Sequence, residues 1–391
     1  MAVRRKPSRS RVYFDHNASS PMRPEASKAM RDAIKAAAGN PASLHAEGRA
    51  ARARIEDARA QVAQLAGTKP SSVVFTSGGS EAIEAAIRGV CDRAPAYVRR
   101  IVVSEIEHSA VLQAARAMAR LGFTVEEVPC GSDGRVDPER FCAALKRHTA
   151  LAALQWANNE TGVLQPVEEV GRACRNAGVP FLIDAVQVAG KVAIDPRTTR
   201  ADFFAYSAHK IGGPQGAGAL VVREGIVLAP LIHGGAQETR RRGGTPDVPA
   251  IAGFGAAAAV AAADHKDEAA RMLRLRARLE TRLRDLFPDI RFHAQAAPRL
   301  PNTVNMAIPG VPGDLLAIAL DVAGVAVSTG SACASGAVEP SHVLLAMGHD
   351  EAAARGAVRL SLGWNSTAAA VDRFLGVVPD VVERVRAGLA D

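Results

Sequence analysis

Cysteine is scarce in this sequence, and its spacing excludes two kinds of stabilised fold. The 391 residues include five cysteines, an odd number, and no two of them form a C-x-x-C pair. A disulfide framework or a structural zinc site needs paired or clustered cysteines. The unpaired thiols fit a reducing compartment, and we predict a cytoplasmic protein without a resident metal.

Long apolar runs are also missing from the sequence. Hydrophobic residues make up 48% of the chain and aromatic residues only 4%, which still allows large buried cores. We find no apolar run long and uninterrupted enough to span a bilayer, and no apolar segment near the start typical of a signal peptide. We therefore predict no membrane association, and the length favours two domains.

Acidic residues are absent from the first 14 positions, which contain Arg4, Arg5, Lys6, Arg9 and Arg11. The net charge is +8, so the rest of the chain carries only 8 − 5 = 3 positive charges. A basic arm is one way to bind nucleic acid or an anionic membrane. The body is nearly balanced and contains no nucleic-acid-binding motif, so we favour a solvated arm.

Short apolar runs alternate with longer helical patterns through most of the chain. Near-continuous apolar strands separated by helices are typical of a mostly parallel sheet covered on both faces. The expected strands are Ser72–Thr76, Arg100–Val103, Thr124–Val128, Ala150–Trp156, Pro180–Asp184, Phe203–Ser207 and Gly218–Val222. The expected helices are residues 24–66 with a break near Gly39–His45, Ser80–Val90, His108–Arg120, Asp137–His148 and Val167–Ala177.

The pattern changes after about residue 245, where a smaller α+β domain is expected. Its expected elements are helices Ile251–Ala263 and Lys266–Leu286, a helix from Pro312, a strand at Val325–Ser328 and a strand from Ala357. We divide the chain into a basic arm with the start of the small domain (1–14), a large domain (15–262) and a small C-terminal domain (263–391).

Polar side chains follow several expected strands, at the sheet edge where ligands bind in open α/β folds. Each has an ordinary explanation when taken alone, as a helix cap, a turn residue or a solvated charge. Together they fit pyridoxal 5′-phosphate (PLP), which needs a lysine, an acid for its pyridine nitrogen and donors for its phosphate. The candidates are Lys210 and Asp184, with Ser80, Ser207 and His209 for the phosphate, His108 for the ring face, and Gln187 and Asn159 for the ring oxygen.

Two further residues complete this chemistry. Arg359 lies in an apolar strand pattern, where a charged residue usually points to water, but its forked guanidinium also suits a substrate carboxylate. Cys333 lies among glycine, serine and alanine in STGSACASGAVEPSHVL. Such neighbours give a thiol little to pack against, which suits a thiol that must reach a ligand. The other cysteines lie in helical patterns or near a strand end, and we interpret them as core or incidental.

A family resemblance rests on motifs distributed over most of the chain. They are FDHNASSP, GNPASLH, VVFTSGGSEA, EIEHSAVL, NNETGVLQPV, DAVQVAGK, SAHKIGGPQGAGAL, GGAQETRRRGGT and STGSACASGAVEPSHVL. In this order they resemble the cysteine desulfurases, a branch of the class V aminotransferases among PLP-dependent enzymes. The resemblance implies the PLP-dependent transferase fold of type I, with a large, mostly parallel seven-stranded sheet domain and a smaller α+β domain.

The resemblance also implies a role for each candidate residue. Lys210 would carry the cofactor, Asp184 would bind the pyridinium nitrogen, and His108 would stack on the ring with Gln187 and Asn159 near its oxygen. Gly79, Ser80, Ser207 and His209 would hold the phosphate, with Thr245 reaching the phosphate of a second subunit in a homodimer. Arg359, with Asn159, would bind the substrate L-cysteine. Cys333 would be the nucleophile that keeps the sulfur as a persulfide; a transient iron–sulfur ligation by Cys333 is the only metal role implied.

The sulfur acceptor and the reaction class leave alternatives open. An iron–sulfur scaffold and a carrier for tRNA thiolation are both acceptors of the implied kind, and the short C-terminal tail leaves partner choice open. A selenocysteine lyase or an aminotransferase would share the fold, although an aminotransferase has no use for Cys333. A non-catalytic interaction protein is the alternative from a different class. The chain departs from the family at two places, with Gly79-Ser80 where alanine-threonine is common and ASSP where ATTP is usual.

Overall fold

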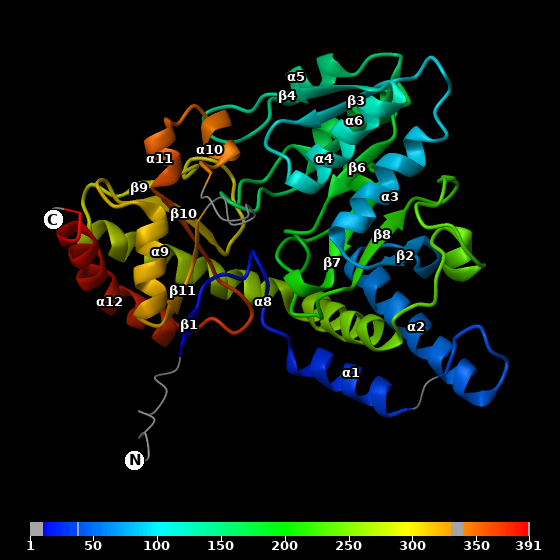
Figure 1. Ribbon diagram of the computed structural model, residues 1–391, viewed down its shortest axis with the longest axis horizontal. Coiled ribbons are helices and arrows are strands. Elements are labelled where there is room, and N and C mark those ends of the chain that lie inside the picture. The colour runs from blue at the N-terminus through cyan, green and yellow to red at the C-terminus, as the bar shows by residue number, and fades with distance from the viewer. Residues whose placement is uncertain (1–10, 37–38, 330–338, 390–391) are drawn as a thin grey trace.

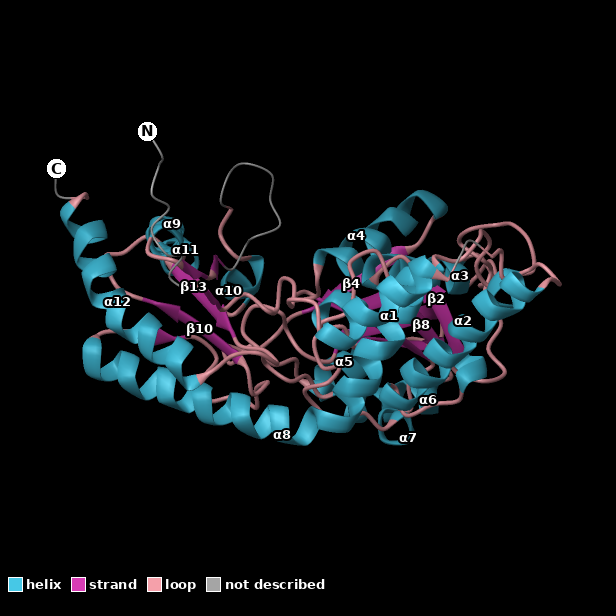
Figure 2. Ribbon diagram, turned by 90° about the horizontal axis from the view of Figure 1, so that it is seen from below, coloured by secondary structure: helices cyan, strands magenta, loops and turns pink. Residues whose placement is uncertain are grey.

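The computed structural model describes residues 11–36, 39–329 and 339–389. The two larger β-sheets lie side by side, the seven-stranded one on the right in Figure 1 and the four-stranded one on the left. Helix α8 (Val248–Leu286) runs beneath both sheets (Figure 2). The expected α/β architecture with a large sheet and a smaller α+β unit is therefore present.

The larger sheet contains all seven strands that the sequence predicts. Its order is β2-β8-β7-β6-β5-β3-β4, and only β8 runs antiparallel to its neighbours. Parallel neighbours place their carboxyl ends at one edge, which is where the predicted site residues follow. The strands are β2 (Val73–Thr76), β3 (Arg100–Ser104), β4 (Thr124–Val128), β5 (Thr149–Gln155), β6 (Phe181–Asp184), β7 (Phe203–Ser207) and β8 (Gly218–Val222).

Helices cover both faces of this sheet because its strands are apolar on both sides. Ile101 and Val103 of β3 pack in one core cluster and Val102, between them, packs in another, as the alternation of side chains along a strand requires. One face is covered by α3 (Gly79–Cys91) and α4 (Ser109–Ala117). The other face is covered by α2 (Ala46–Leu65), α5 (Pro138–Ala144), α6 (Val167–Ala177) and the first half of α8. Helix α1 (Pro24–Lys35) packs on α8. The short helix α7 (Pro196–Thr199) lies between β6 and β7 in the chain.

The smaller sheet is built from the C-terminal part of the chain. Its order is β12-β13-β10-β9, all antiparallel, and β1 pairs in parallel with β11 beside it. The strands are β1 (Val12–Tyr13), β9 (Arg291–Phe292), β10 (Thr303–Ala307), β11 (Val325–Ala326), β12 (Ser328–Thr329) and β13 (Ala357–Ser361). The helices are α9 (Gly313–Val322), α10 (His342–Ala346), α11 (Glu351–Arg355) and α12 (Ala368–Ala387). Four 3-10 turns are η1 (Pro70–Ser72), η2 (Met118–Leu121), η3 (Ala208–Lys210) and η4 (Gln237–Arg240).

Helix α8 is one continuous helix of 39 residues where the sequence predicts two. Its alanine-rich first half, up to Ala261, packs in the core of the larger sheet, and its second half, from Met272, packs in the core of the smaller one. By length and composition α8 could cross a membrane, which corrects the expectation that no such run exists. Alanine supplies most of this apolar run, which contains few of the larger aliphatic residues that mark a typical membrane span. Its packing against α1 and α2 explains it as a core helix.

Candidate active site

A cavity of about 670 Å³ lies beyond the carboxyl ends of the parallel strands. It collects side chains from both parts of the molecule, because Tyr13 and Arg359 come from the smaller sheet's side and the rest follow strands of the larger sheet. The sequence-predicted residues in its wall are Gly79, Ser80, His108, Asn159, Asp184, Gln187, Ser207, His209, Lys210 and Arg359. Thr245 is exposed and lies outside this wall, and Cys333 lies outside the described residues.

Lys210 ends the turn η3, directly after strand β7. Its Nζ donates to the backbone carbonyls of Asn17 (2.7 Å) and Ala18 (2.8 Å) in the loop after β1. The neighbouring His209 ring nitrogen Nδ1 lies 3.2 Å from the hydroxyl of Ser19 in the same loop. The loop after β1 thus holds the amine at the cavity wall, although this loop is far from β7 in the sequence.

Asp184 is the last residue of β6 and is only 8% exposed. One carboxylate oxygen accepts a hydrogen bond from the backbone N–H of Val186 (3.0 Å). Burial raises the pKa of Asp184, while the nearby His108 and Lys210 counteract this rise. A cationic group that entered the cavity beside Asp184 would further favour the ionised carboxylate.

His108 is the N-cap of α4, and this role fixes its ring. Its Nδ1 accepts from the backbone N–H of Ala110 (3.1 Å), so Nε2 carries the proton of the neutral ring. Burial lowers the pKa of His108, an effect that Asp184 opposes. The cap hydrogen bond fixes the orientation of this imidazole. A neutral ring in a fixed orientation is suited to stack on another aromatic ring.

The start of α3 forms an anion-binding corner of the cavity. Its N-cap is Gly78, which has no side chain to satisfy the free backbone N–H groups. A Cβ on Gly79 would lie 2.8 Å from a methyl carbon of Val186, so this close approach requires glycine. Ser80 and Ser207 border the same cavity. Free N–H groups at a helix start, together with hydroxyls, are suited to bind a phosphate.

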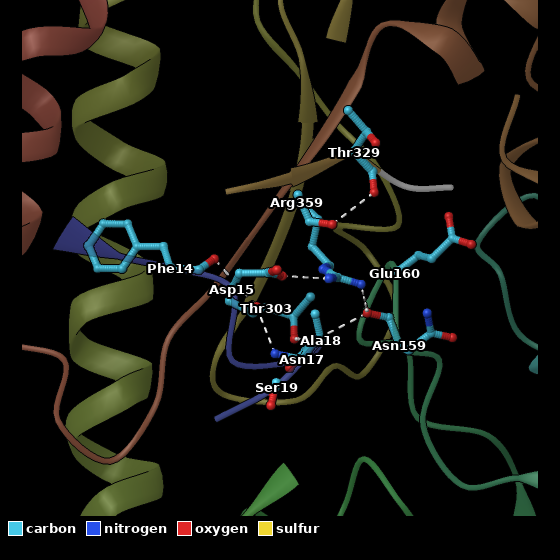
Figure 3. Close-up of polar contacts among 12 residues, drawn as sticks. Phe14, Asp15, Asn17, Ala18, Ser19, Asn159, Glu160, Thr303, Thr329 and Arg359 are labelled. Atoms are coloured by element: carbon cyan, nitrogen blue, oxygen red, sulfur yellow. Dashed lines mark hydrogen bonds and ion pairs between the residues drawn. The ribbon is translucent and has the colours of Figure 1, made fainter. Parts of the chain in front are cut away.

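Arg359, on β13, is held from two sides (Figure 3). Its Nη2 forms an ion pair with Asp15 (2.7 Å) and its Nη1 donates to the backbone carbonyl of Asn159 (3.1 Å). The residue is 3% exposed, and its Nε has no hydrogen-bond partner among the described residues. The guanidinium is therefore oriented at the cavity wall before any substrate binds.

The donor set fits PLP. A buried amide oxygen, Oε1 of Gln187, has no partner among the described residues, while its Nε2 donates to the carbonyl of Asn17. This oxygen can accept a hydrogen from a phenolic hydroxyl of the kind that PLP carries next to its aldehyde. Lys210, the buried Asp184, His108 and the start of α3 border the same cavity. Among the described residues, no group of three or more His, Cys, Asp or Glu side chains could hold a metal.

Sequence reasoning missed Asp15 and Asn17, which line the cavity, and Glu160, which lies behind its wall. Asp15 pairs with Arg359, Asn17 supplies its carbonyl to Lys210 and Gln187, and Glu160 lies buried next to Arg359. The first two lie in the motif FDHNASSP and Glu160 lies in NNETGVLQPV. Acids and amides at the ends of expected strands are the signal that could have identified them, and it led only to Asp184, Gln187 and Asn159.

Glu160 should make stability depend on pH. Its pKa is raised to about 7, chiefly by burial, while Ser341 and Arg359 act in the opposite direction. A raised pKa in the folded protein gives stability that is present below the ordinary pKa and lost as the pH rises toward 7. We expect the wild-type free energy of unfolding to fall by roughly 3 kcal/mol more than that of Glu160→Gln between about pH 4.5 and 7. Urea unfolding across this range measures the difference, and parallel curves would contradict it.

The chain is similar over most of its length to proteins of one family. Residues 12–374 match the family model described as aminotransferase class V. A cysteine desulfurase of Cereibacter sphaeroides is 45% identical over 380 residues, which cover 96% of this chain and 97% of that protein. A solved NifS-like protein has a TM-score of 0.88 and 34% identity, covering 96% of this chain and 100% of that one. The structure of SspA in complex with cysteine has a TM-score of 0.80 and 32% identity, covering 90% and 98%.

Proposed function

The chain belongs to the class V aminotransferase family, as one of its cysteine desulfurases, and from this premise we propose how its own residues perform the reaction. Members of this family depend on PLP. We propose that PLP is held by Lys210, that L-cysteine is bound by Arg359, and that its sulfur passes to Cys333. The observation that carries this proposal is the convergence of Lys210, Asp184 and Arg359 on one cavity.

The residues around the larger sheet would hold the cofactor and move protons. When bound, PLP supplies an electron sink for the substrate's α-carbon. Asp184, ionised beside a cationic nitrogen, would keep that nitrogen protonated. Lys210, once its amine is free, would remove and return the proton at the α-carbon. His108 would cover one face of the ring, and the start of α3 with Ser80, Ser207 and His209 would hold the phosphate.

The other four cysteines are poor candidates for the nucleophile, which leaves Cys333 for this role. Burial raises the pKa of Cys91 and Cys130 to about 12 and also raises the pKa of Cys142 and Cys174. A thiol with a raised pKa is a poor nucleophile at neutral pH because the thiolate is the reactive form. None of these four cysteines lies in the cavity wall.

The sulfur transfer balances without an added oxidant. The Cys333 thiolate attacks the sulfur of bound L-cysteine, and an S–S bond forms as the carbon–sulfur bond breaks. The electron pair of the broken bond stays with the substrate carbon, which is then protonated. The products are L-alanine and a persulfide on Cys333.

A homodimer and a cytoplasmic location complete the proposal. Thr245 is exposed and separated from the cavity of its own chain, which leaves it available to the phosphate of a second subunit. We propose an iron–sulfur scaffold or a sulfur-carrier protein as the acceptor. We also propose that residues 15–262 form the cofactor-binding domain and residues 263–391 the domain that carries Cys333, with residues 1–14 as a basic arm and the start of the small domain.

Mass spectrometry of the purified protein after addition of L-cysteine tests the proposal. We expect one added sulfur on the peptide that contains Cys333, together with L-alanine in solution. Transamination of a keto acid without sulfur release would favour an aminotransferase, and release from selenocysteine alone would favour a lyase for that substrate. Purified protein without visible cofactor absorbance would support a non-catalytic protein.

Arg359 should determine how tightly L-cysteine binds. A lysine cannot reproduce the forked contact with a carboxylate. We expect Arg359→Lys to raise the KM for L-cysteine by roughly 10-fold to 100-fold, since a charged hydrogen bond contributes about 1.5–3 kcal/mol. Steady-state kinetics measure this change. Arg355→Lys, at the exposed end of α11, is the matched control, and an equal KM for both variants would contradict the assignment.

A further inference from the structure

Ser341 joins the start of α10 to a loop that follows a strand of the larger sheet. It is 2% exposed and lies at the start of α10, in the same connecting segment as Cys333. Its hydroxyl donates to the carboxylate of Glu160 and accepts from the backbone N–H of Leu344 (3.2 Å). One side chain therefore both caps α10 and binds α10 to a loop that follows strand β5.

The loop that carries Glu160 also holds the substrate-binding arginine. The backbone carbonyl of Asn159 accepts from Arg359 (3.1 Å), and the backbone carbonyl of Glu160 accepts from the side chain of Asn305 on β10 (3.2 Å). Glu160 is 4% exposed, so its carboxylate has little competing contact with water. Figure 3 shows Glu160 next to Asn159, which contacts Arg359. Two adjacent residues thus contact β10, β13 and the start of α10.

A second contact fixes the same end of α10. The Nε2 of His342 lies 3.1 Å from the backbone carbonyl of Glu107, the residue before the ring-facing His108. Ser341 and His342 are consecutive, and each binds a different strand-end loop of the larger sheet. The start of α10 is therefore fixed relative to both the ring face and the arginine.

We propose that Glu160 is a positioning residue for sulfur transfer. Through Ser341 it fixes the end of the segment that carries Cys333 to the loop that holds Arg359. The substrate's carboxylate and the origin of the attacking thiol's tether are then placed by one buried loop. This inference rests on the proposed roles of Cys333 and Arg359.

The removal of this contact should slow the transfer of sulfur more than the binding of L-cysteine. An error of about 1 Å in the placement of a reacting group can cost about 100-fold in rate. We expect Glu160→Ala to slow persulfide formation on Cys333 by about 10-fold to 100-fold while the KM for L-cysteine changes by less than about 3-fold. Ser341→Ala should have the same effect, and the double variant should be no slower than either single variant.

Three controls separate positioning from stability. Asp350→Ala removes the cap of the neighbouring helix α11, where the Asp350 carboxylate accepts from the backbone N–H of Ala353 (2.7 Å). It should transfer sulfur at the wild-type rate. Glu160→Gln keeps a side chain of the same length that can hydrogen-bond to Ser341, and should restore most of the rate. Hydrogen exchange should rise in the peptide 341–347 of Glu160→Ala and not in that of Asp350→Ala.

The readout is rapid-quench mass spectrometry of the holoenzyme at the Cys333 peptide. A wild-type rate in Glu160→Ala would overturn the inference, as would equal losses in Glu160→Ala and Asp350→Ala. If Glu160→Ala does not fold, Ser341→Ala against Asp350→Ala decides the same question. No persulfide on Cys333 in the wild-type protein would instead overturn the proposed function, so the two failures are distinguishable.

Discussion

Cys333→Ala should retain bound PLP and lose persulfide formation entirely. In our proposal the cofactor is held by Lys210, Asp184 and the start of α3, which border the cavity, and Cys333 is not needed to hold it. The turnover of L-cysteine to L-alanine should fall by at least about 1,000-fold, because a covalent nucleophile is not replaced by neighbouring groups. Site-resolved mass spectrometry and an alanine assay measure the two effects.

Cys142→Ala is the matched control for this variant. Cys142 is partly exposed on α5 and does not line the cavity, so its replacement should leave turnover at the wild-type rate. Sulfur release by Cys333→Ala at the wild-type rate would show that another group accepts the sulfur. In that case the cysteines with raised pKa values would need to be replaced one by one.

Lys210→Ala should abolish the visible absorbance of the purified protein together with its activity. The amine holds the cofactor's aldehyde covalently in our proposal, and it also moves the proton at the substrate's α-carbon. The loss of a general base alone costs about 100-fold to 10,000-fold in rate, and the loss of the covalent attachment adds to this. Absorbance spectra and turnover, measured with added PLP, test both parts.

Lys69→Ala provides the comparison, because Lys69 pairs with Glu224 on the exposed surface. Its spectrum and turnover should equal those of the wild type. An unchanged visible spectrum in Lys210→Ala would mean that another amine carries the cofactor. Lys191 would then be examined first, because its buried amine lies close enough to Lys210 to have its pKa lowered by that charge, after the larger effect of burial.

The strands of the larger sheet could be predicted because they are apolar on both faces. Strand β5, for example, has no polar face, and every one of its residues is buried. A short run of this kind is typical of a strand covered on both faces. Once these strands are placed, the residues that follow them must meet at one edge. This is why Lys210, Asp184 and His108 could be placed together from the sequence, whereas Arg359 lies within β13 of the smaller sheet and does not follow from this argument.

Contacts between distant segments could not be predicted in the same way. The pair of Asp15 and Arg359 joins residues 344 positions apart, and the pair of Glu160 and Ser341 joins residues 181 positions apart. A single sequence shows that each residue follows a strand or begins a helix, but it does not show which partner it meets. Position 245 posed a different difficulty, because its proposed role needs a second chain.

The length of α8 was underestimated for a local reason. The charged stretch 264–268 suggested a break between two helices, yet residues 262–271 contain neither glycine nor proline. The charges are used on the surface of one helix, where Glu268 forms a bidentate ion pair with Arg23. The change from apolar to charged residues therefore marks the point where α8 passes from the core of the larger sheet to that of the smaller one, and not the end of the helix.

Because α8 is continuous, it restricts how the two halves of the enzyme can move relative to each other. A helix of 39 residues is about 58 Å long, and its middle is pinned by Arg23 and by Arg271, which donates to the backbone of the β13–α12 loop. A rigid rod shared by both cores cannot act as a hinge without breaking its own hydrogen bonds. Entry of L-cysteine and departure of L-alanine must then rely on local rearrangement of loops at the cavity mouth. The two halves of the protein keep the same relative orientation.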